Sequence, residues 1–387
     1  MGGATCCGKV AVRYPGEPRA WDFQMQGGIA RGCCKSLTEN RPWDTASSDR
    51  ANRRPMKYFV TGATGFIGTR LVHRLASAGH TVHALARFPG KARDLQLPGV
   101  QLHRGDVTDR ESMRGPMTGV DGVFHLAGWY KLGLRDTSQA VTVNVEGTRN
   151  VLELMRDLAV PRGVYTSSLV VFSDTHGAVA DESYRFTGEY LSTYERTKAI
   201  AHYRVAEPMM AAGLPLVIVQ PGAVYGPGDT SMVRRTLLDF LRRRLPVAPR
   251  GLTLCWGHVE DVVDGHLRAM ERGEPGESYI IGGPAHEITE VLAIVARISG
   301  VPAPRIGIAP SVLKGLAAAA GMVERLLPLP APYSSEMLRV NAGVTYLGSS
   351  AKAERELGFR ARPLEEGMRE TVLHEMRLLG MHPPPAV

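Results

Sequence analysis

The amino-acid sequence predicts an α/β protein in which a doubly wound parallel sheet is followed by a smaller, mostly helical C-terminal region. Three observations support this fold class. A short apolar segment runs into glycines at positions 62, 65 and 68 and is followed by a helical pattern. Further short apolar segments then alternate with helical patterns, as in strand–helix–strand units. After the turn signal at 226–228 the helical patterns dominate. We therefore expect a nucleotide-binding domain over residues 56–228 and a substrate-binding region, intertwined with it, over 229–387.

The glycine turn is the best-defined motif. In Tyr58–Gly68 an apolar strand leads into Gly62, Gly65 and Gly68, and a helix is expected over Thr69–Ala78. This spacing is typical of a Rossmann-type dinucleotide turn. Glycine permits the tight turn, lets backbone N–H groups approach a pyrophosphate and lets the helix pack close to the strand. The positive N-terminus of the helix then faces the phosphates.

The later strands bring side chains to the same edge of the sheet. They are expected over 81–87, 100–106, 122–128, 163–168 and 216–222, with a helix near 144–159. Arg87 lies 19 residues after Gly68, about where such a fold meets the adenosine ribose. A guanidinium there can hold a 2′-phosphate, so Arg87 favours NADP over NAD, although an ordinary surface arginine is the other interpretation. Asn144 is expected either to bond backbone and hold a kink or to cap its helix.

Three residues indicate acid–base chemistry. Ser168 ends the strand over 163–168, at the edge where open α/β sheets bind ligands. Tyr194 and Lys198 stand four residues apart, which places them on one face of a helix. A free phenol has a pKa of about 10, and a nearby ammonium that stabilises phenolate makes it a usable acid or base near neutrality. We expect Tyr194 to handle a proton, Lys198 to assist it and to bond the nicotinamide ribose, and a serine to hold a substrate oxygen.

From Met56 onward the chain resembles the extended short-chain dehydrogenases/reductases of the NAD-dependent epimerase/dehydratase superfamily. Within it, the chain is most similar to the branch of dihydroflavonol reductase-like and 3β-hydroxysteroid dehydrogenase-like proteins, which includes the hopanoid-associated sugar epimerases. The segments that carry the resemblance are TGATGFIG (61–68), GDVTD (105–109), HLAG (125–128), NVEGTRNVLE (144–153), YTSS (165–168), YERTK (194–198), PGAVYGPGD (221–229), HVEDVVDGHL (258–267) and SSAKAERELGF (349–359).

The resemblance implies a role for each matching residue. The catalytic residues would be Ser168, Tyr194 and Lys198. The cofactor would be held by Gly62, Ala63, Thr64, Gly65, Phe66 and Ile67 around the pyrophosphate, Arg87, Asp106 and Val107 towards the adenosine, Leu126, Ala127 and Gly128 at the ribose, Pro221 and Val224 beside the nicotinamide, and Thr166, Tyr194 and Lys198. Two residues depart from the family pattern, because Gln220 stands where arginine is frequent and Gly128 where alanine is frequent. These departures leave subfamily and substrate open.

The substrate side is less informative. Trp129 and Tyr130 follow the strand over 122–128 directly, so they are expected either to line the substrate cleft or to pack under a loop. His258 is expected to be a satisfied structural histidine rather than a ligand of cofactor or substrate. No group of His, Cys, Asp and Glu has metal-ligand spacing, so no metal is expected.

Charge and hydropathy argue against nucleic-acid binding and membrane insertion. The net charge is +8, but residues 1–55 hold nine Lys and Arg against five Asp and Glu, so half of the excess lies there. The rest of the chain is nearly balanced. No apolar stretch reaches the length of a membrane span. The most apolar helix expected, Val312–Leu327, is interrupted by Lys314, Glu324 and Arg325, which favours a packed or lid-like amphipathic helix over an interfacial one.

Residues 1–55 differ from the rest of the chain and lack sustained periodicity. They hold four of the five cysteines, but without zinc-ligand spacing: Cys6, Cys7, Cys33 and Cys34. Met56 opens the first strand, so we expect residues 1–55 to be disordered or to be an upstream start that the working protein does not use. Cys255 is the remaining cysteine, so no disulfide framework is expected and a reducing cytoplasm fits.

We therefore predict an NAD(P)-dependent oxidoreductase that moves a hydride between nicotinamide and a carbonyl or secondary alcohol carbon of a small molecule. One alternative is a nucleotide-sugar epimerase or dehydratase that retains NAD. Leu169 weakens the dehydratase, which often carries an acidic residue at that position. A second alternative is a non-catalytic nucleotide-binding redox sensor. The resemblance implies a possible homodimer through the helices near 144–159 and 194–212, but the sequence does not determine the substrate, the direction of reaction or the oligomeric state.

Overall fold

The computed structural model describes residues 54–134, 136–382 and 384. The expectations for residues 1–55, including those for their four cysteines, therefore fall almost entirely outside the described residues. Residues 54–387 form one compact unit.

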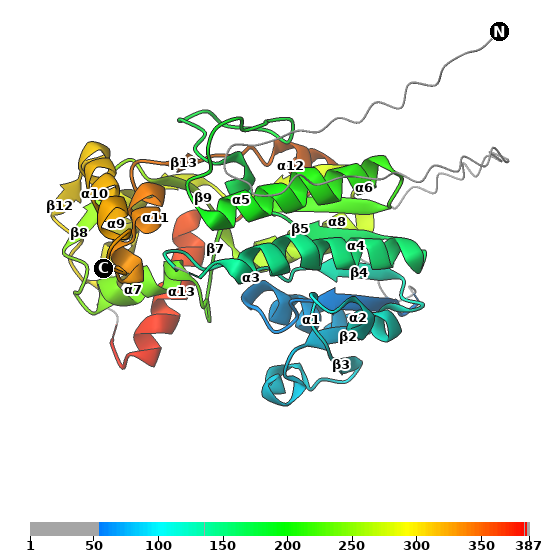
Figure 1. Ribbon diagram of the computed structural model, residues 1–387. Coiled ribbons are helices and arrows are strands. Elements are labelled where there is room, and N and C mark those ends of the chain that lie inside the picture. The colour runs from blue at the N-terminus through cyan, green and yellow to red at the C-terminus, as the bar shows by residue number, and fades with distance from the viewer. Residues whose placement is uncertain (1–53, 135, 383, 385–387) are drawn as a thin grey trace, which may run out of the picture. The chain divides into compact units, whose positions relative to one another are not determined.

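Within the described residues, seven strands form one parallel sheet in the order β10-β6-β5-β4-β1-β2-β3 (Figure 1). Its strands are β1 (Lys57–Thr61), β2 (Thr81–Ala86), β3 (Val100–Arg104), β4 (Gly122–His125), β5 (Gly163–Thr166), β6 (Leu216–Pro221) and β10 (Ser278–Ile281). The strand order reverses direction between β1 and β4, which pair in parallel. In open α/β sheets the crevice at the carboxyl ends of such strands binds the ligand. The seven-stranded parallel sheet confirms the predicted fold class.

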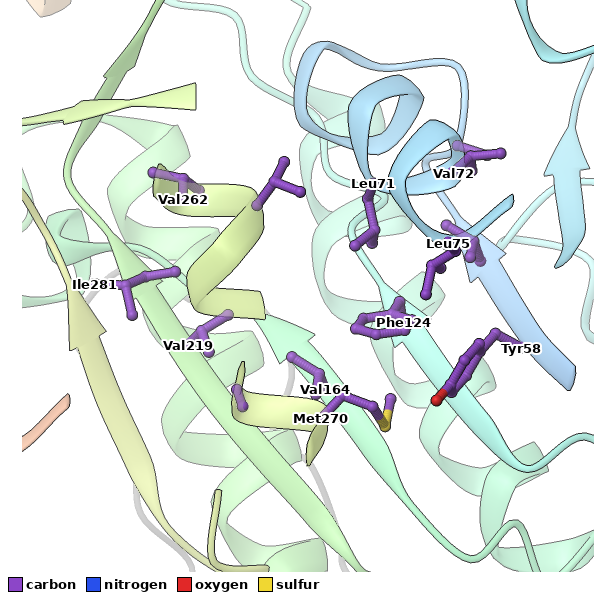
Figure 2. Close-up of a cluster of buried hydrophobic side chains, with 14 of the residues drawn as sticks. Tyr58, Leu71, Val72, Leu75, Phe124, Val164, Val219, Val262, Met270 and Ile281 are labelled. Carbon is purple, nitrogen blue, oxygen red and sulfur yellow. The ribbon is translucent and has the colours of Figure 1, made fainter. Parts of the chain in front are cut away.

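Helices cover both faces of the sheet. One face carries α1 (Phe66–Ser77), α8 (Val259–Arg272) and α12 (Ala351–Leu357). Figure 2 shows Leu71 and Leu75 of α1 and Met270 of α8 approaching Phe124 and Val164 of the sheet. These side chains are nearly or fully buried, so the turn before α1 rests on a packed core.

The other face carries α2 (Arg110–Met117) and two long interrupted helices. The first consists of α3 (Ser138–Val141), a π-helical turn over Thr142–Glu146 and α4 (Gly147–Asp157). The second consists of α5 (Thr193–Ile200), a π-helical turn over Ala201–Ala206 and α6 (Glu207–Ala211). Both helices were expected from the sequence, but their π turns were not. Such turns are rare and are found frequently at functional sites.

The remaining elements build a second core beside the carboxyl edge of the sheet. They include the strands β7 (Ala223–Tyr225), β9 (Thr253–His258), β11 (Ala285–Glu287) and β13 (Thr345–Tyr346) and the pair β8 (Val247–Pro249) and β12 (Ile306–Ile308). The helices are α7 (Met232–Leu241), α9 (Ile288–Ser299), α10 (Pro310–Val323), α11 (Ser335–Val340) and α13 (Leu364–Leu378). Short 3-10 turns lie at Pro89–Lys91, Arg93–Leu95, Leu169–Phe172 and Ala331–Tyr333.

Two sequence expectations can be placed in these elements. His258 is buried and caps α8, where its Nδ1 accepts a hydrogen bond from the Glu260 N–H at 3.4 Å, as a structural role requires. Its Nε2 lies 3.5 Å from the Glu370 carboxylate but has no hydrogen-bond partner among the described residues, so the ring is not fully satisfied, contrary to the expectation. The apolar helix expected over 312–327 is α10, which ends at Val323. Over the described residues, no helix combines the length and apolar character that crossing a membrane requires.

Candidate active site

A cleft of about 990 Å³ opens at the carboxyl edge of the sheet. It brings together residues that are far apart in the chain. The described lining includes every residue predicted for catalysis, cofactor or substrate except Ala63, which is fully buried beneath the glycine turn. The patterns that located these residues independently thus converge on one cavity.

The glycine turn has the geometry that a dinucleotide needs. Gly62 has a φ of +67°, and a Cβ on it would lie 2.6 Å from the backbone nitrogen of Ala127. A Cβ on Gly68 would lie 2.1 Å from the Gly62 carbonyl oxygen, so any side chain there would push α1 away from β1. Gly65 precedes the first residue of α1, where the structure shows no side-chain cap and no acidic residue in the first turn. The helix N-terminus therefore offers its N–H groups to an anion, and the turn fits a pyrophosphate.

The two residues predicted for the adenosine end lie in the same cleft but differ in how they are held. Arg87 follows β2, is exposed, lines the cleft and forms no ion pair with a described residue. One oxygen of the Asp106 carboxylate is engaged, because Oδ1 accepts hydrogen bonds from the Thr108 N–H at 3.0 Å and from the Thr108 hydroxyl at 2.9 Å. Arg87 and the second oxygen of Asp106 therefore both keep bonding capacity for a ligand.

Lys198 is held deep in the cleft. Its side chain is 5% exposed, and Nζ donates to the Thr166 carbonyl at 2.7 Å and to the Tyr165 hydroxyl at 3.2 Å. Desolvation by burial lowers the pKa of Lys198 to about 7. The ammonium is therefore positioned by the end of β5, with one N–H direction remaining for a ligand.

The two serines after β5 differ in availability. The Ser167 hydroxyl is paired with Nδ1 of His202 at 2.7 Å. Ser168 caps the short turn over Leu169–Phe172, where its oxygen accepts a long hydrogen bond of 3.4 Å from the Val170 N–H. Both serines line the cleft, and Ser168 is the one whose hydroxyl is not paired with a histidine.

The pKa of Tyr194 runs against one sequence expectation. Burial in the cleft raises the pKa of this phenol above its ordinary value, Tyr130 raises it further, and the hydrogen bond with Ser168 opposes both. Lys198 is not among the groups that shift this pKa, so the expected lowering does not appear in the protein without a dinucleotide. The phenol is therefore a proton donor in the absence of further charges.

Trp129 and Tyr130 both line the cleft, which favours the first of the two alternatives for them. The Tyr130 ring meets the Tyr194 ring edge-on, with centroids 4.8 Å apart, and Tyr130 is 45% exposed. Trp129 is buried, and its backbone N–H donates to Asn144 Oδ1 at 2.6 Å. Tyr130 therefore lies against Tyr194 in the cleft.

Asn144 links the loop that carries Trp129 to α5. Its Nδ2 donates to the Trp129 carbonyl at 3.0 Å and to the Thr197 hydroxyl at 2.9 Å, and the residue lies in the π turn. Of the two roles left open by the sequence, the structure supports backbone bonding in a kink. Glu336 of α11 was missed: its carboxylate accepts the Gly133 N–H at 2.6 Å and the Thr193 N–H at 2.7 Å. No local sequence signal marks this long-range contact.

The part of the cleft beyond Tyr194 is mostly apolar. Its wall includes Leu237, Leu254, Trp256, Val291, Met337 and Val340. Three cations line this half, and none is both unpaired and buried for a deeply bound anion. Arg234 is paired with the buried Glu375 carboxylate through two bonds of 2.8 and 3.0 Å, and Lys131 and Arg235 are exposed. The described residues also contain no group of three or more His, Cys, Asp or Glu that could hold a metal ion.

The fold and the cleft define a nucleotide-dependent oxidoreductase of the extended short-chain dehydrogenase/reductase type. The family model described as "NAD dependent epimerase/dehydratase family" matches residues 58–282, and the chain belongs to this family. This membership confirms the resemblance stated from the sequence and favours an enzyme over the non-catalytic sensor.

Proteins similar to this chain support the same family assignment. The chain is 33% identical over 309 residues to "Sterol demethylase protein B" of Methylococcus capsulatus, covering 78% of this chain and 93% of the relative. It is 36% identical over 259 residues to "Putative dihydroflavonol 4-reductase" of Synechocystis sp., covering 64% and 74%. Among solved structures, gox2253 has a TM-score of 0.74 at 29% identity, covering 84% of this chain and 99% of that one. MoeE5, solved with UDP-glucose and NAD, has a TM-score of 0.66 at 25% identity, covering 84% and 99%.

Proposed function

We propose that this enzyme exchanges a hydride between NADP and a bulky apolar ketone or secondary alcohol. The observation that carries the proposal is the cleft itself, in which Ser168, Tyr194 and Lys198 meet a mostly apolar wall. A nicotinamide, when bound, supplies or accepts the hydride, while the protein provides orientation and electrostatics.

The chain's own residues would divide the remaining work. The Ser168 hydroxyl would hold the substrate oxygen, and the Tyr194 phenol, kept protonated by its surroundings, would donate a proton to that oxygen during reduction. Lys198, anchored by the Thr166 carbonyl, would bond the nicotinamide ribose. In oxidation the proton would pass in the opposite direction.

The preference for NADP is supported by Arg87. It follows β2 and lines the cleft with no ion-pair partner among the described residues. A guanidinium can bind a 2′-phosphate through two parallel hydrogen bonds, whereas a free carboxylate would repel it.

The apolar substrate class is supported by the wall and by the names of relatives. Burial of each large apolar group against such a wall is worth about 1.5–3 kcal/mol, so a ring system or long chain would bind well. The relatives include "3 beta-hydroxysteroid dehydrogenase/Delta 5-->4-isomerase" of Mycobacterium tuberculosis, at 26% identity, and "2-alkyl-3-oxoalkanoate reductase" of Stenotrophomonas maltophilia, at 31%.

The second candidate is a nucleotide-sugar epimerase with retained NAD, favoured by the similarity to MoeE5 with UDP-glucose and NAD. Against it, the substrate half of the cleft gives a diphosphate no buried unpaired cation, because Arg234 is neutralised by Glu375 and because Lys131 and Arg235 are exposed. NADPH and NADH are to be compared with aldehydes, ketones, flavonoid-like, steroid-like and sugar substrates. Net consumption of NADPH against an apolar ketone supports the proposal. Retained cofactor and turnover of a nucleotide sugar without net redox change supports the epimerase.

We further propose that the protein is a cytoplasmic homodimer. Val143, Ile200, Met209 and Met210 on the two interrupted helices are apolar and only partly buried, which suits packing against the same helices of a second copy. Light scattering of the full chain tests this, and a monomer over the working concentration range would contradict it.

A further inference from the structure

An unusual apolar surface lies on α10 and the loop that follows it. Most large apolar side chains that the described residues leave exposed belong to this one segment or to the adjacent β12. We call it the α10 surface, and it consists of Val312, Leu316, Met322, Val323, Leu326, Leu327 and Tyr333. Leu326 is 83% exposed and Leu327 is 65% exposed, so most of each residue is open to solvent.

The helix presents its large side chains outward and packs mainly with its small ones. Val312, Leu316 and Val323 follow one another at helical spacing and share one side of α10, and all are exposed. Its buried residues are Leu313, Ala317 and Ala320, and α10 packs against α11, as Figure 1 shows. A surface helix normally does the reverse, with its bulky apolar stripe on the core. The exposed stripe therefore suits an apolar environment outside the protein.

The charged residues around this surface indicate whether a lipid bilayer or a second copy of this chain covers it. Arg305, Lys314 and Arg325 are exposed and form no ion pair with a described residue. The one acidic residue of the segment, Glu324, is bonded to the Ser335 N–H at 2.9 Å and to its hydroxyl at 2.6 Å. Apolar side chains flanked by cations match the surface of an anionic lipid bilayer. A second copy of this chain would instead bring the same three cations towards one another.

The α10 surface adjoins the cleft. Pro332, next to Tyr333 of this surface, and Met337 of α11 line the cleft, and α11 holds the loop beside Tyr130 through the bond between Glu336 and the Gly133 N–H. On that loop Leu134 is also exposed. The surface and the substrate side of the cleft therefore lie on one connected piece of structure.

We propose that the α10 surface docks the enzyme on the surface of an anionic lipid bilayer. The apolar side chains enter the boundary between headgroups and acyl chains, and the cations meet the lipid phosphates. An apolar substrate dissolved in the bilayer then has a short path to Tyr130. The docking is independent of the proposed function, whereas this advantage for the reaction rests on it.

The test is co-sedimentation of the full chain with vesicles of phosphatidylcholine, with and without phosphatidylglycerol. No substrate or dinucleotide is added, so the outcome does not depend on the reaction. The wild type is expected to bind the anionic vesicles more tightly and to be released by salt. Leu326→Glu with Leu327→Glu is expected to weaken binding about tenfold or more, and Lys314→Gln with Arg325→Gln to remove the preference for anionic lipid.

The matched control is Leu378→Glu on α13, which changes an equally apolar residue that is 62% exposed and lies outside the α10 surface. It is expected to bind as the wild type does. Thermal unfolding of every variant shows that the fold is kept, because all substituted side chains are exposed. Absence of wild-type binding to either vesicle, or equal binding by the Leu326→Glu/Leu327→Glu variant, would overturn the proposal. A wild-type oligomer that dissociates in this variant without vesicles would assign the surface to a second copy instead.

Discussion

Replacing Lys198 by methionine is expected to make the protein more stable and inactive. Methionine has a similar length and no charge, so it removes the cost of burying an ammonium. Lowering the pKa of Lys198 from its ordinary 10.5 to about 7 corresponds to about 5 kcal/mol of lost stability below pH 7. The variant also loses the two hydrogen bonds to Thr166 and Tyr165, worth about 2–3 kcal/mol together. The net expectation is a gain of about 2–3 kcal/mol in the free energy of unfolding near pH 6.

Which of the two proteins is the more stable depends on pH. The unfolded lysine binds a proton up to about pH 10.5, whereas the folded one releases it near pH 7. Between these values the unfolded state holds more protons, so the wild type gains stability as the pH rises, and the variant does not. Near pH 10.5 the wild type is expected to be the more stable of the two. Urea unfolding of both proteins at about pH 6 and about pH 10, without dinucleotide, measures this. A variant that is less stable by the same amount at both pH values would refute the reasoning.

The remaining predictions concern the glycine turn, the loop anchor and the adenosine end. Gly68→Ala is expected to lose dinucleotide binding and about 3 kcal/mol of stability, because its Cβ meets the Gly62 carbonyl. Gly115→Ala on α2 is the control, because a Cβ at this position meets no atom within 4 Å. Urea unfolding is expected to give this variant an unchanged or slightly higher free energy of unfolding. Asn144→Ala is expected to cost about 2–3 kcal/mol by leaving the buried Trp129 N–H unpaired, and Asn144→Asp at least as much, since its second oxygen would face the Trp129 carbonyl oxygen; unchanged unfolding of either variant would contradict this. Arg87→Ala is expected to raise the KM for NADPH about tenfold or more and to leave that for NADH unchanged; a parallel rise in both would argue against 2′-phosphate recognition.

Much of the fold could be predicted from local patterns, whereas most of the predicted cofactor residues came from the family resemblance. The glycine turn, the strand ends and the pair Tyr194 and Lys198 each depend on short-range rules of backbone geometry. Because parallel strands end at the same edge of the sheet, these rules also predict that the residues meet. The start of α5 also carries a local signal from which we drew no prediction, since Ser192 caps it and is followed three residues later by Glu195.

The features that escaped prediction depend on distant parts of the chain or on burial. Glu336 reaches Gly133 over 203 residues, and no pattern near either residue indicates it. The pKa of Tyr194 was misjudged because the sequence shows the spacing of Lys198 but not how deeply both side chains are desolvated. The outward face of α10 was likewise hidden, since an apolar helical pattern does not reveal which side of the helix meets the protein.

The central claim is that Tyr194 exchanges a proton with a substrate oxygen while a hydride passes to or from nicotinamide. The most direct measurement is the steady-state oxidation of NADPH by an apolar ketone, compared between the wild type and Tyr194→Phe. The account predicts a fall in kcat of about 10²–10⁴-fold with the dinucleotide still bound, because phenylalanine fills the same space without the proton. Equal turnover by the two proteins would contradict it.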